Sequence, residues 1–133
     1  MRYTLGFLTA LMACGPVAGA MAQTNVDKLK SLQGTSRPVI VLSDSRDDPR
    51  VARQIAALDH TRPGLDDRNI QVLTEAKPGS RLRKTLGVAE RGFAVVLVGK
   101  DGSVKKVWRD PVDPHQIFTL IDAMPMRRQE MRG

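Results

Sequence analysis

The chain has 133 residues, one cysteine and a formal net charge of +7, a length that suits one domain with a single core. The basic residues are spread along the sequence without a long run, and Trp108 and Phe93 do not form a stacking platform, which excludes a typical nucleic-acid-binding protein. The charge favours a soluble positive surface, with a site for an acidic polymer or anionic lipid headgroups as the alternative.

Residues 1–22 have the layout of a secretory signal peptide. Arg2 precedes an apolar stretch over residues 5–20, and Ala20-Met21-Ala22 supplies the small residues that precede a cleavage site. Glycine and proline interrupt the apolar stretch, which falls short of the about 20 residues that a membrane span needs. We therefore expect no transmembrane span, cleavage near Ala22, and a single domain over residues 23–133 in the periplasm or secreted.

The only cysteine, Cys14, lies inside this predicted signal peptide. Cleavage after Ala22 removes it, so the exported domain has no disulfide, no thiolate nucleophile and no cysteine metal ligand. A lipoprotein anchored at Cys14 is the minor alternative, because Leu11-Met12-Ala13-Cys14 loosely resembles a lipobox. Met12 fits that pattern poorly, and a further cleavage site follows it.

The exported chain begins with a predicted helix and a predicted strand. Residues 23–34 favour a short helix that ends at Gly34. Pro38-Val39-Ile40-Val41-Leu42 is continuously apolar. A strand without polar alternation is usually covered on both faces, so this segment is predicted to lie in the middle of a sheet.

A second helix is predicted from Pro49, which suits a first helical turn, with Asp47 or Asp48 as its cap. Its apolar residues have the spacing i, i+4 and i+7, and three polar residues fall mostly off that stripe. The apolar residues are Val51, Ile55 and Leu58, and the polar residues are Arg50, Arg53 and Gln54.

The middle of the chain predicts a break, a strand and a short helix. Pro63-Gly64 interrupts the helical pattern, and the charged residues that follow are typical of a surface segment. Residues 69–74 predict a strand with partial alternation, and Pro78-Gly79 predicts a turn. Ser80 can cap a two-turn helix that Gly87 ends.

The last part of the chain predicts a hairpin and a helix. Residues 92–99, GFAVVLVG, predict a strand that is apolar on both faces. Lys100-Asp101-Gly102-Ser103 predicts a hairpin turn, because Asp-Gly accepts positive φ at little cost. Residues 104–109 return as an edge strand whose lysines oppose pairing with other chains. A last helix starts at Asp113-Pro114, and Pro125 ends or kinks it.

The predicted order after the first helix is β-α-β-α-β-β-α. Each strand–helix–strand unit requires a right-handed crossover between parallel strands, and the closing hairpin adds an antiparallel edge. We therefore predict an α/β, thioredoxin-like three-layer fold with a mixed four-stranded sheet and a short N-terminal helix.

Three stretches carry a resemblance to a known family: DDPRVARQIAAL at 47–58, GFAVVLVGKDGSVK at 92–105 and IDAMPMRRQEM at 121–131. Together they resemble the P-DUDES family of thioredoxin-like domains, catalogued as domain of unknown function 4174, over residues 26–131. The resemblance implies a thioredoxin fold without the redox cysteines, bacterial exported proteins, and relatives within secreted animal matrix proteins. It implies no established activity and no catalytic residue.

A comparison with working thioredoxins shows where the redox groups are missing. Their dithiol starts the first helix on the sheet, which corresponds to residues 45–50, and their cis-proline precedes the third strand, which corresponds to Glu90-Arg91-Gly92. Neither segment has the required residue, so loss of thiol chemistry is the economical interpretation. A redox or peroxide-handling enzyme remains the alternative, and it requires that Cys14 is retained.

A candidate binding loop follows the first strand, at a helix start that offers unpaired N–H groups. Its aspartates lack the spacing of a calcium loop, and neither His60 nor His115 is placed to activate its serines. The expected fold brings Arg91 close, which allows a carboxylate or phosphate to bind there, although a plain capping role is favoured. The loop comprises Ser43, Asp44, Ser45, Arg46, Asp47, Asp48, Arg91 and Gly92.

The segment 121–131 is the most distinctive part of the sequence. Met126, Arg127 and Arg128 can form a soft apolar and basic contact for a partner protein. In the alternative interpretation these arginines lie in solvent or pair with Asp122 or Glu130. The sequence leaves this choice open.

These observations lead to a non-catalytic, exported and monomeric binding module with no cofactor, no metal and no catalytic residue. Its expected partner is an envelope protein or an anionic envelope component. The alternatives are the thioredoxin-fold redox or peroxide-handling enzyme and a polyanion-binding envelope surface protein. The fold alone does not decide between them.

Overall fold

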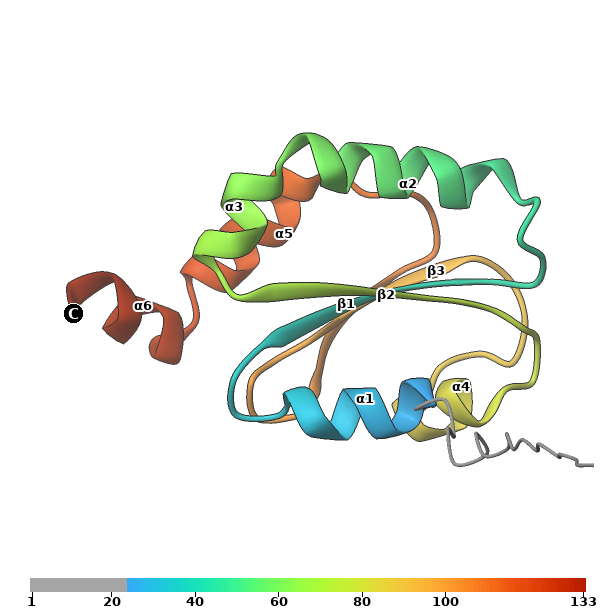
Figure 1. The fold of residues 1–133 in the computed structure, drawn as a ribbon, viewed down its shortest axis with the longest axis horizontal. Helices are drawn as coiled ribbons and strands as arrows, with labels where there is room; N and C mark the ends of the chain where they lie inside the picture. Colours follow the sequence, from blue (N-terminus) through green and yellow to red (C-terminus); the bar gives the residue numbers. More distant parts are fainter. Residues whose placement is uncertain (1–23) are drawn as a thin grey trace, which may run out of the picture.

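The computed structural model describes residues 24–133 (Figure 1). The predicted signal peptide and Cys14 lie outside the described residues. The elements are, in chain order, α1 (Asn25–Leu32), β1 (Arg37–Ser43), α2 (Pro49–His60), α3 (Arg62–Asp67), β2 (Ile70–Ala76), α4 (Arg81–Leu86), β3 (Ala94–Val98), β4 (Val104–Trp108), α5 (Pro114–Asp122) and α6 (Pro125–Arg132). The predicted order β-α-β-α-β-β-α is therefore present, and α3 and α6 are additional.

The four strands form one mixed sheet in the order β2-β1-β3-β4. β1 runs parallel to β2 and antiparallel to β3, and β4 returns antiparallel beside β3. Val39 of β1 is paired in register with Val72 on one side and with Leu97 on the other. The predicted mixed four-stranded sheet is confirmed.

Helices cover both faces of the sheet. α2, α3 and α5 lie on one face, and α1 and α4 lie on the other (Figure 1). Alternate side chains of β1 enter the two cores in turn, because successive strand residues point to opposite faces. Val39 and Val41 pack in the core that contains Leu58 of α2, whereas Ile40 and Leu42 pack in the other. All seven residues of β1 are buried. The apolar run 38–42 predicts this for the middle of the strand, but not for Arg37 and Ser43 at its ends.

The helices are short, and the longest of those described, α2, has 12 residues. Within residues 24–133, none is both long and apolar enough to cross a membrane.

Polar side chains and glycine set the helix ends where the sequence predicts them. The Asp48 carboxylate accepts a hydrogen bond from the Arg50 N–H at 2.9 Å and so caps α2. Of the two aspartates predicted for this role, Asp48 therefore performs it. Ser80 caps α4, and Gly87, with a φ of 70°, ends that helix in the left-handed conformation that glycine adopts readily.

Two segments differ from the sequence prediction. Residues 62–67 form helix α3, where Pro63-Gly64 predicts an interruption. A proline in the first turn removes no helical hydrogen bond, and the fully buried Leu65 attaches the helix to the core. Pro125 also lies in a first turn: α5 already ends at Asp122, and Pro125 begins the separate helix α6.

Gln54 is also placed differently from its prediction. The sequence puts it mostly off the apolar stripe of α2, yet it is only 1% exposed. The reason is a polar partner inside the protein, because its amide bonds to the backbone of Val112.

The β3–β4 hairpin forms at the predicted turn. The Gly99 N–H donates to the Ser103 carbonyl at 2.9 Å, and Gly102 has a φ of 85°. Lys105 and Lys106 are exposed on β4, an outer strand of the sheet. Their charges oppose pairing of this edge with another chain.

Candidate functional site

The candidate binding loop lies at the end of β1, where its antiparallel neighbour β3 begins. Leu42 is paired with Ala94, so residues 91–92 lie beside the loop. The Asp44 carboxylate accepts a hydrogen bond from the Gly92 N–H at 2.9 Å. The expected proximity of the two segments is observed, and their role in binding stays a prediction.

Arg83 of α4 holds these two segments together. Its side chain is 1% exposed and contacts the Asp44 carboxylate at 3.5 Å. It also donates to three backbone carbonyls, those of Lys77, Ala89 and Gly92, at 3.2, 3.0 and 2.8 Å. Sequence reasoning missed this residue because arginine on a short helix usually lies in solvent. The only sequence signal for its burial was its position next to Leu82, which faces the core.

The serines of the loop bond within the loop, and Asp48 bonds to Arg50 at the start of α2. The Ser43 hydroxyl donates to the Ser45 carbonyl at 2.9 Å, and the Ser45 hydroxyl accepts from the Asp47 N–H at 3.1 Å. Asp48 receives two hydrogen bonds from the Arg50 guanidinium, at 3.0 and 2.8 Å, which lower the pKa of the Asp48 carboxyl. The helix start therefore has its own anion, and this opposes the binding of a second one.

Arg46 is the loop residue that borders a cavity. The cavity is open, has a volume of about 510 Å³ and is lined by parts of α1, α2 and β2. In it, one oxygen of the Glu75 carboxylate accepts from the Asn25 amide at 3.0 Å, and the other has no hydrogen-bond partner in the described structure. Within residues 24–133, no group of three or more histidine, cysteine, aspartate or glutamate side chains is placed to hold a metal ion. The loop thus has accessible space for a ligand on the side of Arg46.

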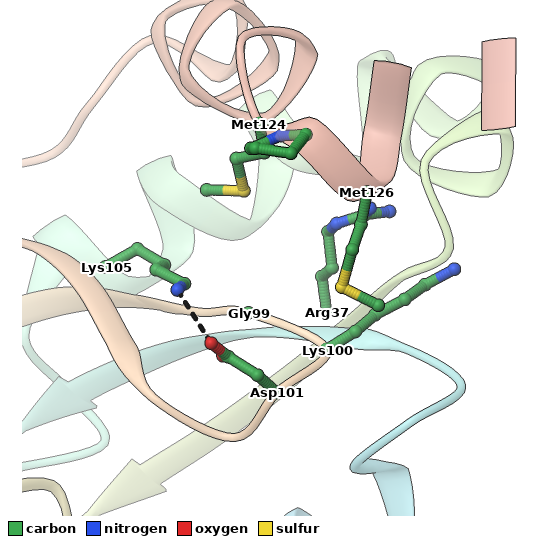
Figure 2. Close-up of a pocket in the computed structure, with 8 residues that line it drawn as sticks. Arg37, Gly99, Lys100, Asp101, Lys105, Met124 and Met126 are labelled. Atoms are coloured by element: carbon green, nitrogen blue, oxygen red, sulfur yellow. Dashed lines mark hydrogen bonds and ion pairs between the residues drawn. The ribbon is translucent and has the colours of Figure 1, made fainter. Parts of the chain in front are cut away.

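A second cavity, of about 320 Å³, lies at the opposite end of β1, between the β3–β4 hairpin and the start of α6. We call it the methionine cavity. Figure 2 shows Met124 and Met126 reaching into it from the α6 side, with the Lys105–Asp101 pair across from them. Met126 is 48% exposed. The full lining is Arg37, Gly99, Lys100, Asp101, Lys105, Met124, Pro125 and Met126.

Arg127 is buried within the domain, and its role in a partner contact stays a prediction. Its guanidinium donates to the Asp67 carboxylate at 2.6 Å and to the Asp122 carboxylate at 3.1 Å. Burial acts to lower the pKa of Arg127, but these hydrogen bonds outweigh it and raise the pKa. Arg127 therefore pairs with Asp122 and, at 3.6 Å, with Glu130, the two partners that the alternative interpretation named, whereas Arg128 is exposed on α6.

Glu130 of α6 bridges two cations at the wall of the methionine cavity. Its carboxylate accepts two hydrogen bonds from the Arg37 guanidinium, at 3.2 and 2.9 Å, and one from the Lys100 ammonium, at 2.7 Å. The hydrogen bonds from Arg37, followed by the one from Lys100, lower the pKa of Glu130 to about 2, although burial acts to raise it. Sequence reasoning missed this cluster because Arg37 and Glu130 are 93 positions apart.

The chain is similar in structure to peroxiredoxins. The reduced 2-Cys peroxiredoxin of Plasmodium vivax matches with a TM-score of 0.58 and 16% identity, over 76% of this chain and 84% of that chain. Thioredoxin peroxidase I of Plasmodium yoelii matches with a TM-score of 0.51 and 15% identity, over 76% and 79%. At this identity the similarity shows the fold alone, and it confirms the predicted thioredoxin-like fold.

Sequence comparison connects the chain to an animal protein and to a domain family. A stretch of 51 residues is 41% identical to Coiled-coil domain-containing protein 80 of Danio rerio. It covers 38% of this chain and 6% of that protein, so the chain spans a small fraction of this relative's length. The family described as "Domain of unknown function (DUF4174)" matches residues 28–130. The chain therefore belongs to the DUF4174 family.

Proposed function

We propose that this chain is a non-catalytic, exported binding module whose contact surface is the methionine cavity. The proposed partner is an envelope protein that presents an apolar side chain next to a carboxylate. One observation carries the proposal: two methionines and three cations line the same cavity.

The lining suits a partner with both kinds of group. Methionine side chains adapt to apolar groups of different shapes, and Met126 is half exposed. Lys105 is accessible as well, with 33% of its side chain exposed, and it is paired with Asp101 at 2.9 Å. An exposed pair of this kind contributes little stability, so Lys105 can exchange Asp101 for a carboxylate of the partner.

The non-catalytic part of the proposal is supported by the residues at the dithiol position. Residues 24–133 contain no cysteine. Asp44 and Asp48 are bonded to Gly92 and Arg50 within the protein. Both carboxylates therefore have a structural role, because Asp48 caps α2 and Asp44 holds the segment at Gly92.

The redox or peroxide-handling alternative depends on Cys14, because peroxide reduction by a thiol needs a thiolate. We expect mass spectrometry of the exported protein to show a chain that starts at Gln23. We also expect that chain to consume no peroxide in the presence of dithiothreitol. Peroxide consumption that disappears in Cys14→Ser supports the redox alternative and contradicts our proposal.

A random peptide library displayed on phage tests the proposed contact. Selection on residues 23–133 is expected to enrich peptides in which an acidic residue lies next to an apolar one. Met126→Asp places a carboxylate in the cavity and is expected to weaken their binding, measured by calorimetry, about tenfold or more. Met131→Asp makes the same change at an exposed position of α6 outside the cavity lining and is expected to have no effect.

Two outcomes contradict this assignment of the contact surface. Equal binding of the selected peptides to Met126→Asp and to the unmodified chain removes the methionine cavity from the contact. If Arg46→Glu abolishes binding of the selected peptides and Met126→Asp does not weaken it, the contact surface is the candidate binding loop.

The polyanion-binding alternative predicts a different behaviour. A surface that binds an acidic polymer through many charges is retained on a heparin matrix until the salt concentration is high. We expect elution at low salt, because the basic residues are spread and many are paired. Retention at high salt contradicts this expectation.

A further inference from the structure

Helix α6 is attached to the rest of the domain by ion pairs. Arg127 is its one buried side chain, and it pairs with Asp67 and Asp122. Glu130 makes the second attachment, to Arg37 and Lys100. Among the described residues, no side chain of α6 belongs to either hydrophobic core. Figure 1 shows α6 at the end of the molecule, beyond the layers of the sheet and its helices. A helix attached in this way can leave without opening a core.

Beneath α6, Arg37 and Lys100 form a receptor for one carboxylate. The two hydrogen bonds from Arg37 have the forked geometry with which guanidinium groups recognise carboxylates. Groups outside α6 fix both cations: the Arg68 carbonyl accepts from Arg37 at 2.8 Å, and the Asn69 side chain accepts from Lys100 at 3.0 Å. With α6 in place Arg37 is 1% exposed, so removal of the Glu130 charge alone leaves a buried cation that strongly favours another anion.

We propose that Arg37 and Lys100 form a carboxylate-binding site, which Glu130 fills in the free protein and an acidic side chain of the partner fills once α6 is released. Both cations also line the methionine cavity, so one acidic and apolar segment can occupy the site and the cavity together. The inference rests on the proposed function for the nature of the partner. The carboxylate site itself does not depend on any partner.

The internal carboxylate sets the conditions under which the site can be detected. Two residues, Ala123 and Met124, join α5 to α6, so Glu130 competes at an effective concentration on the order of millimolar or above. A weakly binding free carboxylate cannot displace it. Removal of the Glu130 charge therefore makes the site available to simple anions.

The Glu130→Gln variant of the full chain tests the site, with acetate as the probe. We expect acetate, compared with chloride at equal ionic strength, to shift the Arg37 Nε–H resonance of this variant. We also expect acetate to raise its unfolding temperature by about 4 °C or more. The matched control is Glu90→Gln, an exposed glutamate at the other end of the sheet. The control and the unmodified chain are expected to show neither effect.

The carboxylate site is overturned if acetate has no specific effect on Glu130→Gln or the same effect on Glu90→Gln. If Glu130→Gln does not fold, a second variant, Glu130→Asp, still tests the site. It keeps the charge but withdraws the carboxylate by one methylene, and acetate is expected to shift the same resonance more weakly. No shift in either variant at position 130 rejects the site.

The peptides selected on phage separate this inference from the proposed function. Binding to Glu130→Gln about tenfold tighter than to the unmodified chain supports the exchange of carboxylates. Equal binding to the two chains means that the peptide leaves Glu130 in place, and this overturns the exchange. If acetate binds the variant and the selection enriches no acidic and apolar peptide, the proposed function fails while the carboxylate site stands.

Discussion

The Gln54 side chain makes two hydrogen bonds with the backbone of Val112: its Nε2 donates to the carbonyl at 3.0 Å and its Oε1 accepts from the N–H at 2.7 Å. Both residues are buried. An amide suits this position because it supplies a donor and an acceptor side by side. The contact joins α2 to the segment that leads into α5, and both helices cover the same face of the sheet (Figure 1).

Gln54→Ala is expected to lower the free energy of unfolding by about 2–4 kcal/mol, because both backbone groups of Val112 lose their partner in a buried place. Urea denaturation followed by circular dichroism measures the change. Arg53→Ala, at an exposed position of the same helix, is the control, with an expected change below about 0.5 kcal/mol. Similar losses in both variants contradict the role given to the amide.

Arg83→Ala is expected to lower the free energy of unfolding by about 3 kcal/mol, since it leaves three backbone carbonyls without their donor. Exchange of the Gly92 amide hydrogen is expected to accelerate as well, because the loop before β3 is no longer held. Arg81→Ala removes an exposed arginine from the same helix and is expected to change neither measurement. If Arg81→Ala lowers the free energy of unfolding as much as Arg83→Ala does, the loss comes from the removed positive charge on α4 and not from the contacts of Arg83.

Asp48→Ala is expected to lower the unfolding temperature by about 4 °C, since α2 loses its cap. Asp47→Ala is the matched control one position earlier, and no change is expected because the backbone N–H of Asp47, not its carboxylate, takes part in the loop bonds. Differential scanning calorimetry distinguishes the two. If Asp47→Ala lowers the unfolding temperature and Asp48→Ala does not, Asp47 is the cap of α2.

The stability of the domain is expected to fall in acid through Glu130. Its pKa in the folded protein, about 2, lies below the ordinary value of 4.5, because Arg37 and Lys100 hold the charged form. The stabilisation is therefore fully present above about pH 5 and is lost as the pH falls from 4.5 towards 2.

Unfolding temperatures measured from pH 7 to pH 2 test this dependence. Glu130→Gln is expected to be less stable than the unmodified chain at pH 7, and the difference is expected to shrink towards pH 2. A constant difference across this range contradicts a role for the carboxylate charge.

Gly64→Ala is expected to destabilise the domain by about 1 kcal/mol, although alanine is the better helix former. A Cβ at this position of α3 lies 2.7 Å from the Phe118 ring, which is too close for an ordinary contact. The same substitution in a Phe118→Leu background is expected to be neutral or stabilising. Destabilisation of equal size in both backgrounds contradicts the clash with the ring.

Most of the fold could be predicted because its central elements have strong local signals. The middle of β1, residues 38–42, and the whole of β3 are continuous apolar runs, and the Asp101-Gly102 turn fixes the hairpin between β3 and β4. Helix α3 could not be predicted in this way, since Pro63-Gly64 is compatible both with a turn and with a helix start. The burial of Leu65, a tertiary contact, selects the helix.

The candidate sites were predictable only in part. Strand order alone brings Gly92 to the loop after β1, because β1 and β3 are antiparallel neighbours. The buried Arg37 and Arg83 could not be predicted, since arginine is usually exposed and its partners here come from distant segments. A single sequence has no signal for a pair such as Arg37 and Glu130. A role for Met126 and Arg128 in binding remains a prediction.

The order of Arg37 and Glu130 along the chain has a consequence during synthesis. A ribosome releases the earlier part of a polypeptide first, so the central strand emerges well before the acid that neutralises its guanidinium. Until then the nascent sheet must leave that group in water or bury it uncompensated. A product truncated before residue 130 is therefore expected to be less stable and more exposed to chaperones and proteases.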